Sequence, residues 1–487
     1  MTELSKPVTQ RRSMGLESLH IDHVPAHERH GKASSLFTVW FASNLCMATV
    51  ITGGLAVLVG NNLFWGLVAV LVGNLTGAIF MALHSAQGPR LGVPQLIQGR
   101  GQFGYHGALL AVVLALFMYV GFFVFTAIPA GQSLNVLYPS VSVHLGVVLV
   151  AVPSVVIAII GYRAIHLTQA VTTYIVAVAL VGLTIGVVAY GIPSVTTADF
   201  AAGPFLLAVA IIAVYQAGFA PYVSDYSRYL PEDIGVGAPF WNSYLGTTIG
   251  GVWVMTLGAV LAAQFTDATA TIVDSAATVS HGWKGPILIA LTLGAVGINA
   301  MNLYGGMLSL LTGWSSIRKP PSGSGVRIAC IGVIAALALW LSLAASDNLI
   351  ANYTNFLLLL VYGFVPWTAI NLTDYYIVRH GNYDVPAFFD PKGIYYRNPA
   401  TFTYAGFSLL ALSAYALGVA SQLPFINTTY WKGLAVDSLG GADISWIIGL
   451  IVSAGSYLLL TRAFGSQPGA EVSKPDAVVE QTAPAVS

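Results

Sequence analysis

The polar residues that could bind a small molecule lie inside otherwise apolar stretches. Asn299 and Asn302 are three residues apart, which places both amides on one face of a helix. An amide both donates and accepts hydrogen bonds, so the pair suits the mixed edge of a heterocycle such as a nucleobase. A single asparagine more often holds two membrane helices together. The pair favours a binding role over that structural one.

Aromatic side chains accompany these amides. Phe122 and Thr126 share one face of an expected helix, and Phe219 belongs to another. Most phenylalanines in membrane helices are packing residues, so aromatic content alone indicates little. Together, Phe122 and Phe219 could sandwich a flat ring, and base stacking on an aromatic side chain is worth about 1 to 3 kcal/mol. Gln132 and Ser43 are further candidates for polar contacts with such a ligand.

Charged residues near the apolar stretches are few. Asp225 with Arg228, and Asp374, are candidates for ion pairs or proton handling. All three lie near the expected inner membrane surface, which favours salt bridges that open and close over a proton relay. Cys46 and Cys330 share no spacing with other thiols or histidines, so no metal site is expected.

The stretch from Tyr215 to Pro231 begins as an apolar helix and is then interrupted. Gly218 makes the backbone easy to bend, and Pro221 removes a backbone donor, so a break is expected near Phe219. In hydrocarbon, a break survives only where it is buried in protein or lines a polar cavity. A plain proline kink is the alternative, and this stretch alone does not separate the two.

The composition is that of a polytopic membrane protein. Of the 487 residues, 56% are hydrophobic and 8% are charged, and the mean hydropathy is +0.76. Soluble globular proteins carry about 25% charged residues. The formal net charge is zero, which gives no support for nucleic acid as a partner. The partners expected are the lipid bilayer and a small heterocyclic molecule, and the oligomeric state stays open.

Twelve membrane spans are predicted from the criterion of about 20 mostly apolar residues per span. They cover residues 35–60, 63–83, 107–136, 142–160, 164–190, 204–229, 238–262, 286–314, 325–345, 350–377, 401–421 and 443–463. If both termini are cytoplasmic, 17 of the 19 Lys and Arg residues fall on the cytoplasmic side, and only Lys284 and Lys432 fall outside. This asymmetry predicts a multi-pass protein of the plasma membrane with both termini inside.

The first span has an irregularity that matches the one in the sixth. It holds Ser43, Asn44 and Thr49 at mid-membrane and continues to Gly53 and Gly54. Interrupted helices in corresponding positions of two halves indicate an inverted-repeat transporter with its site at the midplane. We therefore expect an all-α protein built of five plus five spans, with two peripheral helices. The expected parts are a cytoplasmic segment 1–34, a core 35–378, a cytoplasmic loop 379–400, a peripheral pair 401–464 and a disordered cytoplasmic tail 465–487.

Three motifs together resemble the purine-cytosine permeases of the nucleobase-cation-symport-1 family. They are Gly88-Pro-Arg-Leu-Gly92 with Gln95, Arg100 and Phe103-Gly-Tyr105, the stretch Ala220–Tyr229, and Asn302-Leu-Tyr304. The resemblance covers residues 29–400 and implies a LeuT-type fold, alternating access and cation-coupled uptake of a nucleobase or related heterocycle. It also implies substrate contacts for Phe122, Thr126, Phe219, Asn299 and Asn302.

The chain departs from that family pattern in its aromatic and ion-binding positions. Many members have Trp where this chain has Phe122 and Phe219, and Asn where it has Thr126. Sodium-coupled relatives place hydroxyl residues just before the position of Asn299, where this chain has Gly297 and Ile298. Neither side chain offers the oxygen that sodium requires, which favours protons as the coupling ion.

These observations predict a secondary active transporter that imports cytosine, a purine or a similar heterocycle by proton symport. No cofactor and no enzymatic activity are expected. The alternative is a sodium-coupled carrier of another small heterocycle, such as hydantoin, allantoin, thiamine or a pyridine vitamin. A non-transporting membrane receptor is an alternative of another class.

Overall fold

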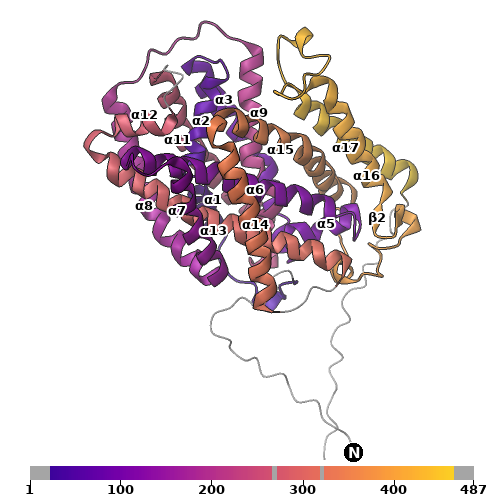
Figure 1. Cartoon of the computed structure of the whole chain (residues 1–487). Coiled ribbons are helices and arrows are strands. Elements are labelled where there is room, and N and C mark those ends of the chain that lie inside the picture. The colour runs from indigo at the N-terminus through magenta and orange to yellow at the C-terminus, as the bar shows by residue number, and fades with distance from the viewer. Residues whose placement is uncertain (1–21, 266–270, 319–322, 466–487) are drawn as a thin grey trace, which may run out of the picture.

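The chain folds into a bundle of helices (Figure 1), as shown by a computed structural model that describes residues 22–265, 271–318 and 323–465. The predicted tail therefore lies outside the described residues except for Gly465, and so do residues 1–21 of the N-terminal segment. The longer helices are α1 (Ser34–Ser43), α2 (Met47–Leu58), α3 (Leu63–Ser85), α5 (Gln95–Phe103), α6 (Leu109–Leu137), α7 (Val143–Ile160), α8 (Tyr162–Tyr190), α9 (Ala202–Ala217), α11 (Gly237–Gln264), α12 (Ile272–Val279), α13 (Lys284–Ile317), α14 (Ser324–Ala345), α15 (Leu349–Leu372), α16 (Leu409–Gln422) and α17 (Ser445–Phe464).

The described helices are consistent with twelve spans. Nine helical stretches are long and apolar enough to cross a membrane, and the bent pair α1 and α2 makes a tenth. One of the nine, Ser324–Val378, counts as two spans, because a 3-10 turn at Ser346–Asn348 divides it into α14 and α15. The remaining span is α16, which together with the 3-10 turn Leu423–Phe425 forms a shorter apolar helix.

The first span is broken between α1 and α2, whose axes differ by 67°. The break lies at Asn44–Cys46, where Cys46 has an extended backbone. Gly53 and Gly54 lie inside α2 and do not interrupt it. A Cβ on Gly53 would lie only 1.9 Å from the carbonyl oxygen of Met255, so this glycine permits close packing of α2 on α11.

The sixth span is broken where the sequence predicts. Helix α9 ends at Ala217, a 3-10 turn covers Ala220–Tyr222, and the short helix α10 covers Val223–Ser227. Pro221 lies at the start of that turn, where its missing N–H is tolerated. Helices α2 and α9 pack together, so the two broken spans meet inside the bundle.

The connection between the second and third spans is a buried structure rather than a linker. It forms α4 (Gly88–Leu91) and α5, and all nine residues of α5 are buried although three of them are glutamines. Gly92 and Gly104 end these helices with positive φ of 62° and 88°, a backbone that glycine adopts without strain. The polar helix α5 is therefore buried within the protein.

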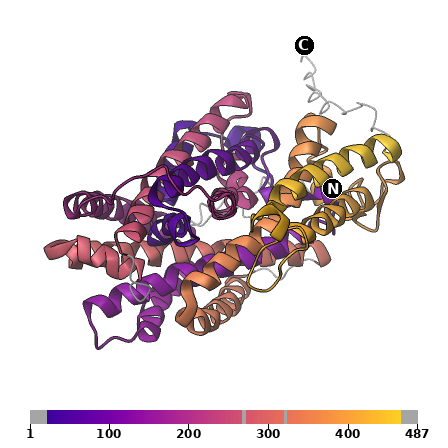
Figure 2. The ribbon, with the colours of Figure 1, turned by 90° about the horizontal axis from the view of Figure 1, so that it is seen from above.

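Helices α16 and α17 are peripheral, as predicted. They pack on each other and on α15, and Figure 2 shows them along one side of the bundle. The expected start of the eleventh span at residue 401 is wrong. Strands β1 (Thr403–Tyr404) and β2 (Phe407–Ser408) pair antiparallel there, around a turn with positive φ at Ala405 and Gly406. The helix begins at Leu409.

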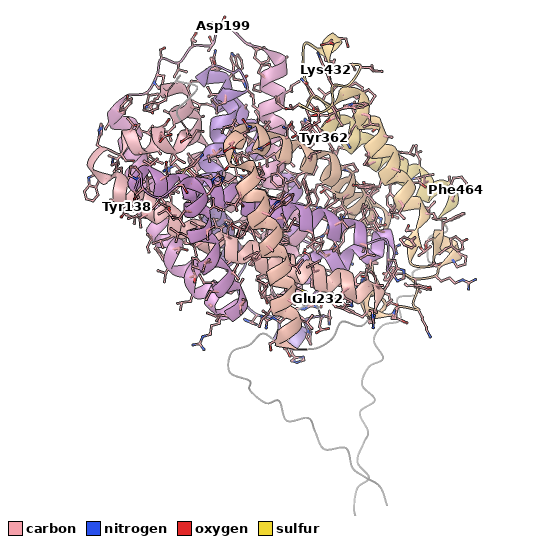
Figure 3. The ribbon with its side chains drawn as sticks, in the orientation of Figure 1. Tyr138, Asp199, Glu232, Tyr362, Lys432 and Phe464 are labelled. Carbon is pink, nitrogen blue, oxygen red and sulfur yellow. The ribbon has the colours of Figure 1, made fainter. Side chains whose placement is uncertain are left out.

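The two ends of the bundle carry the loops alternately. Figure 3 places Asp199 and Lys432 at one end and Glu232 at the opposite end. Asp199 follows α8, Lys432 lies between α16 and α17, and Glu232 follows α10. The end that carries Glu232 is called the inner end below.

Candidate functional site

An aromatic cluster surrounds the break in the sixth span. The ring of Phe219 lies 5.5 Å from Trp40, 6.0 Å from Tyr215 and 6.1 Å from Tyr222, measured between centroids. Trp40 comes from α1, so both broken helices contribute to the cluster. Phe219 is only 9% exposed and Trp40 only 1%. The cluster therefore forms a buried aromatic surface where the two broken spans meet.

The two residues predicted to stack on a substrate both contact Tyr215. Phe122 meets this ring edge-on at 5.8 Å, and Phe219 meets it edge-on at 6.0 Å. Tyr215 in turn shares a hydrogen bond of 2.6 Å between its hydroxyl and that of Thr49 in α2. Phe122 and Phe219 thus belong to one cluster, in which Tyr215 contacts both. Tyr215 was not among the predicted site residues.

The two amides of α13 are adjacent, as their spacing predicts. Asn302 donates from Nδ2 to Oδ1 of Asn299 over 3.4 Å, a long hydrogen bond. Asn299 is fully buried, and its own Nδ2 has no hydrogen-bond partner in the part of the chain that the structure describes. A buried donor without a partner costs about 1 to 3 kcal/mol, so such a group is typical of a site that a ligand completes.

The remaining predicted contacts differ in their surroundings. Thr126 is 5% exposed, on the same helix as Phe122. The Oε1 atom of Gln132 is buried and has no partner among the described residues. Ser43 donates to the carbonyl oxygen of Val39 over 2.8 Å, so its hydroxyl is bonded within its own helix. The structure shows no hydrogen bond that joins these described residues to the Asn299 amide.

A buried amide network that the sequence did not predict as a unit joins the two broken spans. Gln216 donates to the Oδ1 atoms of both Asn44 and Asn74, and Thr247 donates to Oε1 of Gln216. Asn44 donates to the hydroxyl of Thr247 over 3.1 Å. All four side chains are fully buried. Three isolated amides and one hydroxyl in four apolar stretches were the available signal, because polar groups in a membrane interior need partners.

The inner charges are spread over several contacts. Asp225 accepts a hydrogen bond of 3.0 Å at Oδ1 from the backbone N–H of Gln95. Arg228 donates to the carbonyl oxygen of Asp22 and to the hydroxyl of Tyr229, each over 3.0 Å. Both residues thus connect α10 to neighbouring inner segments.

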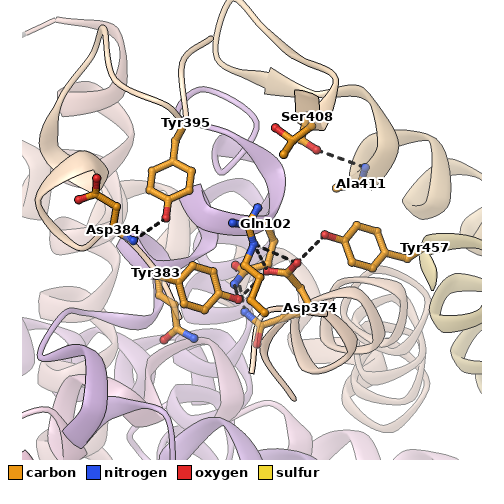
Figure 4. A network of polar contacts seen from close by, with 12 residues as sticks. Gln102, Asp374, Tyr383, Asp384, Tyr395, Ser408, Ala411 and Tyr457 are labelled. Atoms are coloured by element: carbon orange, nitrogen blue, oxygen red, sulfur yellow. Dashed lines mark hydrogen bonds and ion pairs between the residues drawn. The ribbon is translucent and has the colours of Figure 1, made fainter. Parts of the chain in front are cut away.

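Asp374 is a fully buried carboxylate at the inner end of α15 (Figure 4). Arg379 forms an ion pair with it over 3.1 Å, and Tyr383 and Tyr457 donate to its two oxygens. Burial alone would lower the pKa of Arg379, but the Asp374 carboxylate raises it above its ordinary value. Tyr383 also accepts from Gln102 of α5, so three inner segments meet at this carboxylate.

A cavity of about 20 Å³ lies between the aromatic cluster and the inner end. It is large enough for about one water molecule. The lining includes Tyr119, Asp225, Ser309 and Thr312. The ring of Tyr119 lies 5.5 Å from that of Tyr222, so the cavity is directly below the cluster. The described residues contain no group of three or more His, Cys, Asp or Glu side chains that could hold a metal ion.

A helical membrane protein in which two broken spans meet at a buried aromatic and amide-lined centre has the architecture of an inverted-repeat transporter. The family model described as permease for cytosine/purines, uracil, thiamine, allantoin matches residues 23–449. The chain belongs to this permease family.

Individual relatives agree with this assignment. The chain is 38% identical over 451 residues to YxlA of Bacillus subtilis, which carries the provisional name purine-cytosine permease, covering 92% of this chain and 96% of that protein. It is 22% identical to the purine-cytosine permease fcyB of Emericella nidulans, over 92% of this chain and 88% of that protein. These proteins are permeases, which agrees with the prediction that the chain is not an enzyme.

The fold is shared with a solved transporter. Mhp1, a nucleobase-cation-symport-1 family transporter in a closed conformation with bromovinylhydantoin bound, superposes with a TM-score of 0.69 at 17% identity, over 92% of this chain and 96% of Mhp1. The predicted LeuT-type fold is thereby confirmed, and the predicted family is confirmed by the family model. At this identity the likeness concerns the fold alone.

Proposed function

We propose that this permease imports a nucleobase, cytosine or a purine, by proton symport through alternating access. The observation that carries the proposal is the amide of Asn299, on the same helix face as Asn302. It is a fully buried donor that has no partner among the described residues. A nucleobase presents ring nitrogens and carbonyl oxygens that accept from such a donor. Its flat faces suit the aromatic cluster around Phe219.

The surroundings of Gly297 support protons over sodium as the coupling ion. A Cβ at Gly297 would lie 2.5 Å from Oε1 of Gln169 and 3.3 Å from the hydroxyl of Thr172, both on α8. A hydroxyl side chain at position 297 would therefore displace the end of the Gln169 side chain. Sodium binds through several oxygens at once, and neither Gly297 nor Ile298 supplies a side-chain oxygen.

The membrane orientation belongs to the same proposal. We place the chain in the plasma membrane with both termini in the cytoplasm, because that orientation puts 17 of its 19 Lys and Arg residues on the cytoplasmic side. The inner end that carries Glu232 then faces the cytoplasm.

The direct test is uptake of radiolabelled cytosine into liposomes that contain the purified protein. We expect an inward pH gradient to drive accumulation, replacement of sodium by choline to leave it unchanged, and unlabelled purines to compete. Strong sodium dependence would overturn the coupling. If hydantoin or allantoin competes and the bases do not, the proposed substrate is wrong. If no labelled heterocycle is taken up, a receptor is favoured.

The role of the α13 amide is tested by Asn299→Ala. We expect the affinity for cytosine to fall about 5- to 100-fold, which corresponds to losing a hydrogen bond to a buried donor. Asn242→Ala is the matched control, because the amide of Asn242 donates to the carbonyl oxygen of Ala238 in its own helix. Equal affinities of the two variants, measured by isothermal titration calorimetry, would contradict the assignment.

A further inference from the structure

Helix α10 is attached to the inner ends of α3 and α5 by short hydrogen bonds. Ser224 donates to the carbonyl oxygen of His84 over 2.9 Å, and Ser227 donates to that of Ser85 over 2.7 Å. A Cβ on Gly88 would lie 2.1 Å from the Ser227 hydroxyl, so the contact requires glycine there. We call these contacts of α10 the inner seal.

Asp225 is the part of the inner seal that can change its charge. Its Oδ1 accepts the backbone N–H of Gln95 over 3.0 Å, at the first residue of α5. A hydrogen bond to an ionised carboxylate is about twice as strong as one to a neutral acceptor. Protonating Asp225 therefore weakens the attachment of α10 to α5.

Asp225 also lines the cavity below the aromatic cluster. That cavity joins the carboxylate to Tyr119 and to the hydroxyl-bearing residues Ser309 and Thr312 of α13. A cavity with room for about one water is sufficient to bring a proton to the carboxylate. Asp225 thus lies between the candidate substrate position and the inner end.

We propose that Asp225 is the proton-binding residue that couples the proton to the opening of the inner seal. With a proton bound, α10 separates from α5 and the inner end opens. Cytoplasmic water then reaches the carboxylate, the proton leaves to that water, and the seal closes again around the ionised form. This inference rests on the proposed proton symport, and it assigns the proton to one residue.

Other ionisable groups face Asp225 or the seal. Tyr119 comes from α6, and Tyr222, Tyr226 and Arg228 come from the same segment as Asp225. His84 of α3 is linked to the seal through Gln95, whose Nε2 lies 3.1 Å from its Nδ1. His84 is fully buried, and its ring stacks on Trp367. It is the competing proton site that the experiment must separate from Asp225.

Accessibility of the cavity gives a readout that needs no substrate. In a Cys46→Ser, Cys330→Ser background, Thr312→Cys places a thiol on the cavity wall, where Thr312 is only 5% exposed. Alkylation by a membrane-impermeant maleimide from the inner side is measured from pH 8 to pH 5.5. The alkylation rate is divided by the rate for a matched Asp233→Cys variant, because Asp233 is exposed. This division removes the pH dependence that thiol ionisation gives to both rates.

We expect the normalised rate at Thr312→Cys to rise severalfold toward low pH. Adding Asp225→Asn should fix the rate at the high value at every pH, whereas adding His84→Gln should leave the pH dependence in place. A pH dependence that survives Asp225→Asn, or that disappears in His84→Gln, would overturn the proposal.

Transport supplies the second arm. Asp225→Asn should abolish accumulation of radiolabelled cytosine driven by a pH gradient, and Asp233→Asn should not change it. Undiminished accumulation in Asp225→Asn would also overturn the proposal. If cytosine uptake needs no proton gradient, the proposed coupling fails, but the alkylation rates still decide whether Asp225 controls the seal.

Discussion

Gln216 is the residue on which the two broken spans depend for their polar contacts. Its amide bonds to Asn44 at the break in the first span, to Asn74 of α3 and to Thr247 of α11. A fully satisfied buried network holds its members in one arrangement, and it becomes costly when one member is removed. This amide therefore fixes where α1 ends relative to α9.

We predict that Gln216→Met lowers the free energy of unfolding by about 1 to 3 kcal/mol, because buried polar atoms of its neighbours lose their partners. The measurement is the midpoint of thermal unfolding in detergent. Gln264→Met is the control, since its amide reaches the carbonyl oxygens of Val187 and Gly191 near the outer end. A Gln216→Met midpoint equal to that of the control would show that the network is dispensable.

At the scale of elements, the packing of α2 on α11 depends on glycine. The Cβ of an alanine at Gly53 would lie 1.9 Å from a backbone carbonyl oxygen of α11. Backbone cannot move aside as the end of a flexible side chain can. We expect Gly53→Ala to destabilise the protein by about 1 to 3 kcal/mol or to prevent its folding.

The control for this substitution is Gly285→Ala in α13, where a Cβ would meet nothing within 4 Å. Yield and monodispersity in size-exclusion chromatography, followed by thermal unfolding, compare the two variants. Equal behaviour would mean that α2 and α11 can separate without loss.

Hydropathy predicts the helices well because lipid requires long apolar segments that satisfy their own backbone. Eleven of the twelve spans begin within three residues of the predicted positions, and the break at Phe219 follows from Gly218 and Pro221. The strands before α16 were not predicted, because Phe402 and Phe407 continue the apolar character of the helix. Local composition cannot separate a short apolar strand from the start of a span.

The site was predictable in its residue types but not in its contacts. The spacing of Asn299 and Asn302 places them together whatever the fold. Trp40 enters the aromatic cluster only because two breaks, far apart in the chain, lie side by side. The burial of the glutamines in α5 likewise depends on partners elsewhere, such as Gln87 for Gln98 and Tyr383 for Gln102.

At the scale of the whole molecule, the described part of the N-terminal segment fastens the inner end. Val24 donates its N–H to the carbonyl oxygen of Gly92, and His30 donates to that of Tyr229. Arg29 donates to the carbonyl oxygen of Pro89 and pairs with Glu232 over 3.5 Å. This segment therefore bridges the loop after α3 and the loop after α10.

We predict that acidification loosens this segment. Burial, and then the charge of Arg29, lower the pKa of His23 below its ordinary value. A histidine with a lowered pKa stabilises the docking of the N-terminal segment on the inner end fully above about pH 6.5. That stabilisation is lost as the pH falls through the lowered pKa. Arg29 donates to Nε2 of His23 over 3.1 Å, a contact that only the unprotonated nitrogen can accept.

Hydrogen exchange of residues 22–32, corrected for its intrinsic pH dependence, measures this effect. Exchange should rise as the pH falls from 8 to 5.5, and His23→Gln should show no such rise. Protection that is equal at both pH values in the unmodified chain would contradict the prediction.

The carboxylate of Asp374 has a consequence for biosynthesis. Its partner Tyr457 lies 83 residues further along the chain, in α17. Because α17 follows α15 in the chain, the hydrogen bonds of this buried acid cannot all form until the final helix has been made and has packed on α15. The inner end of the core is therefore the part of the fold that is completed last.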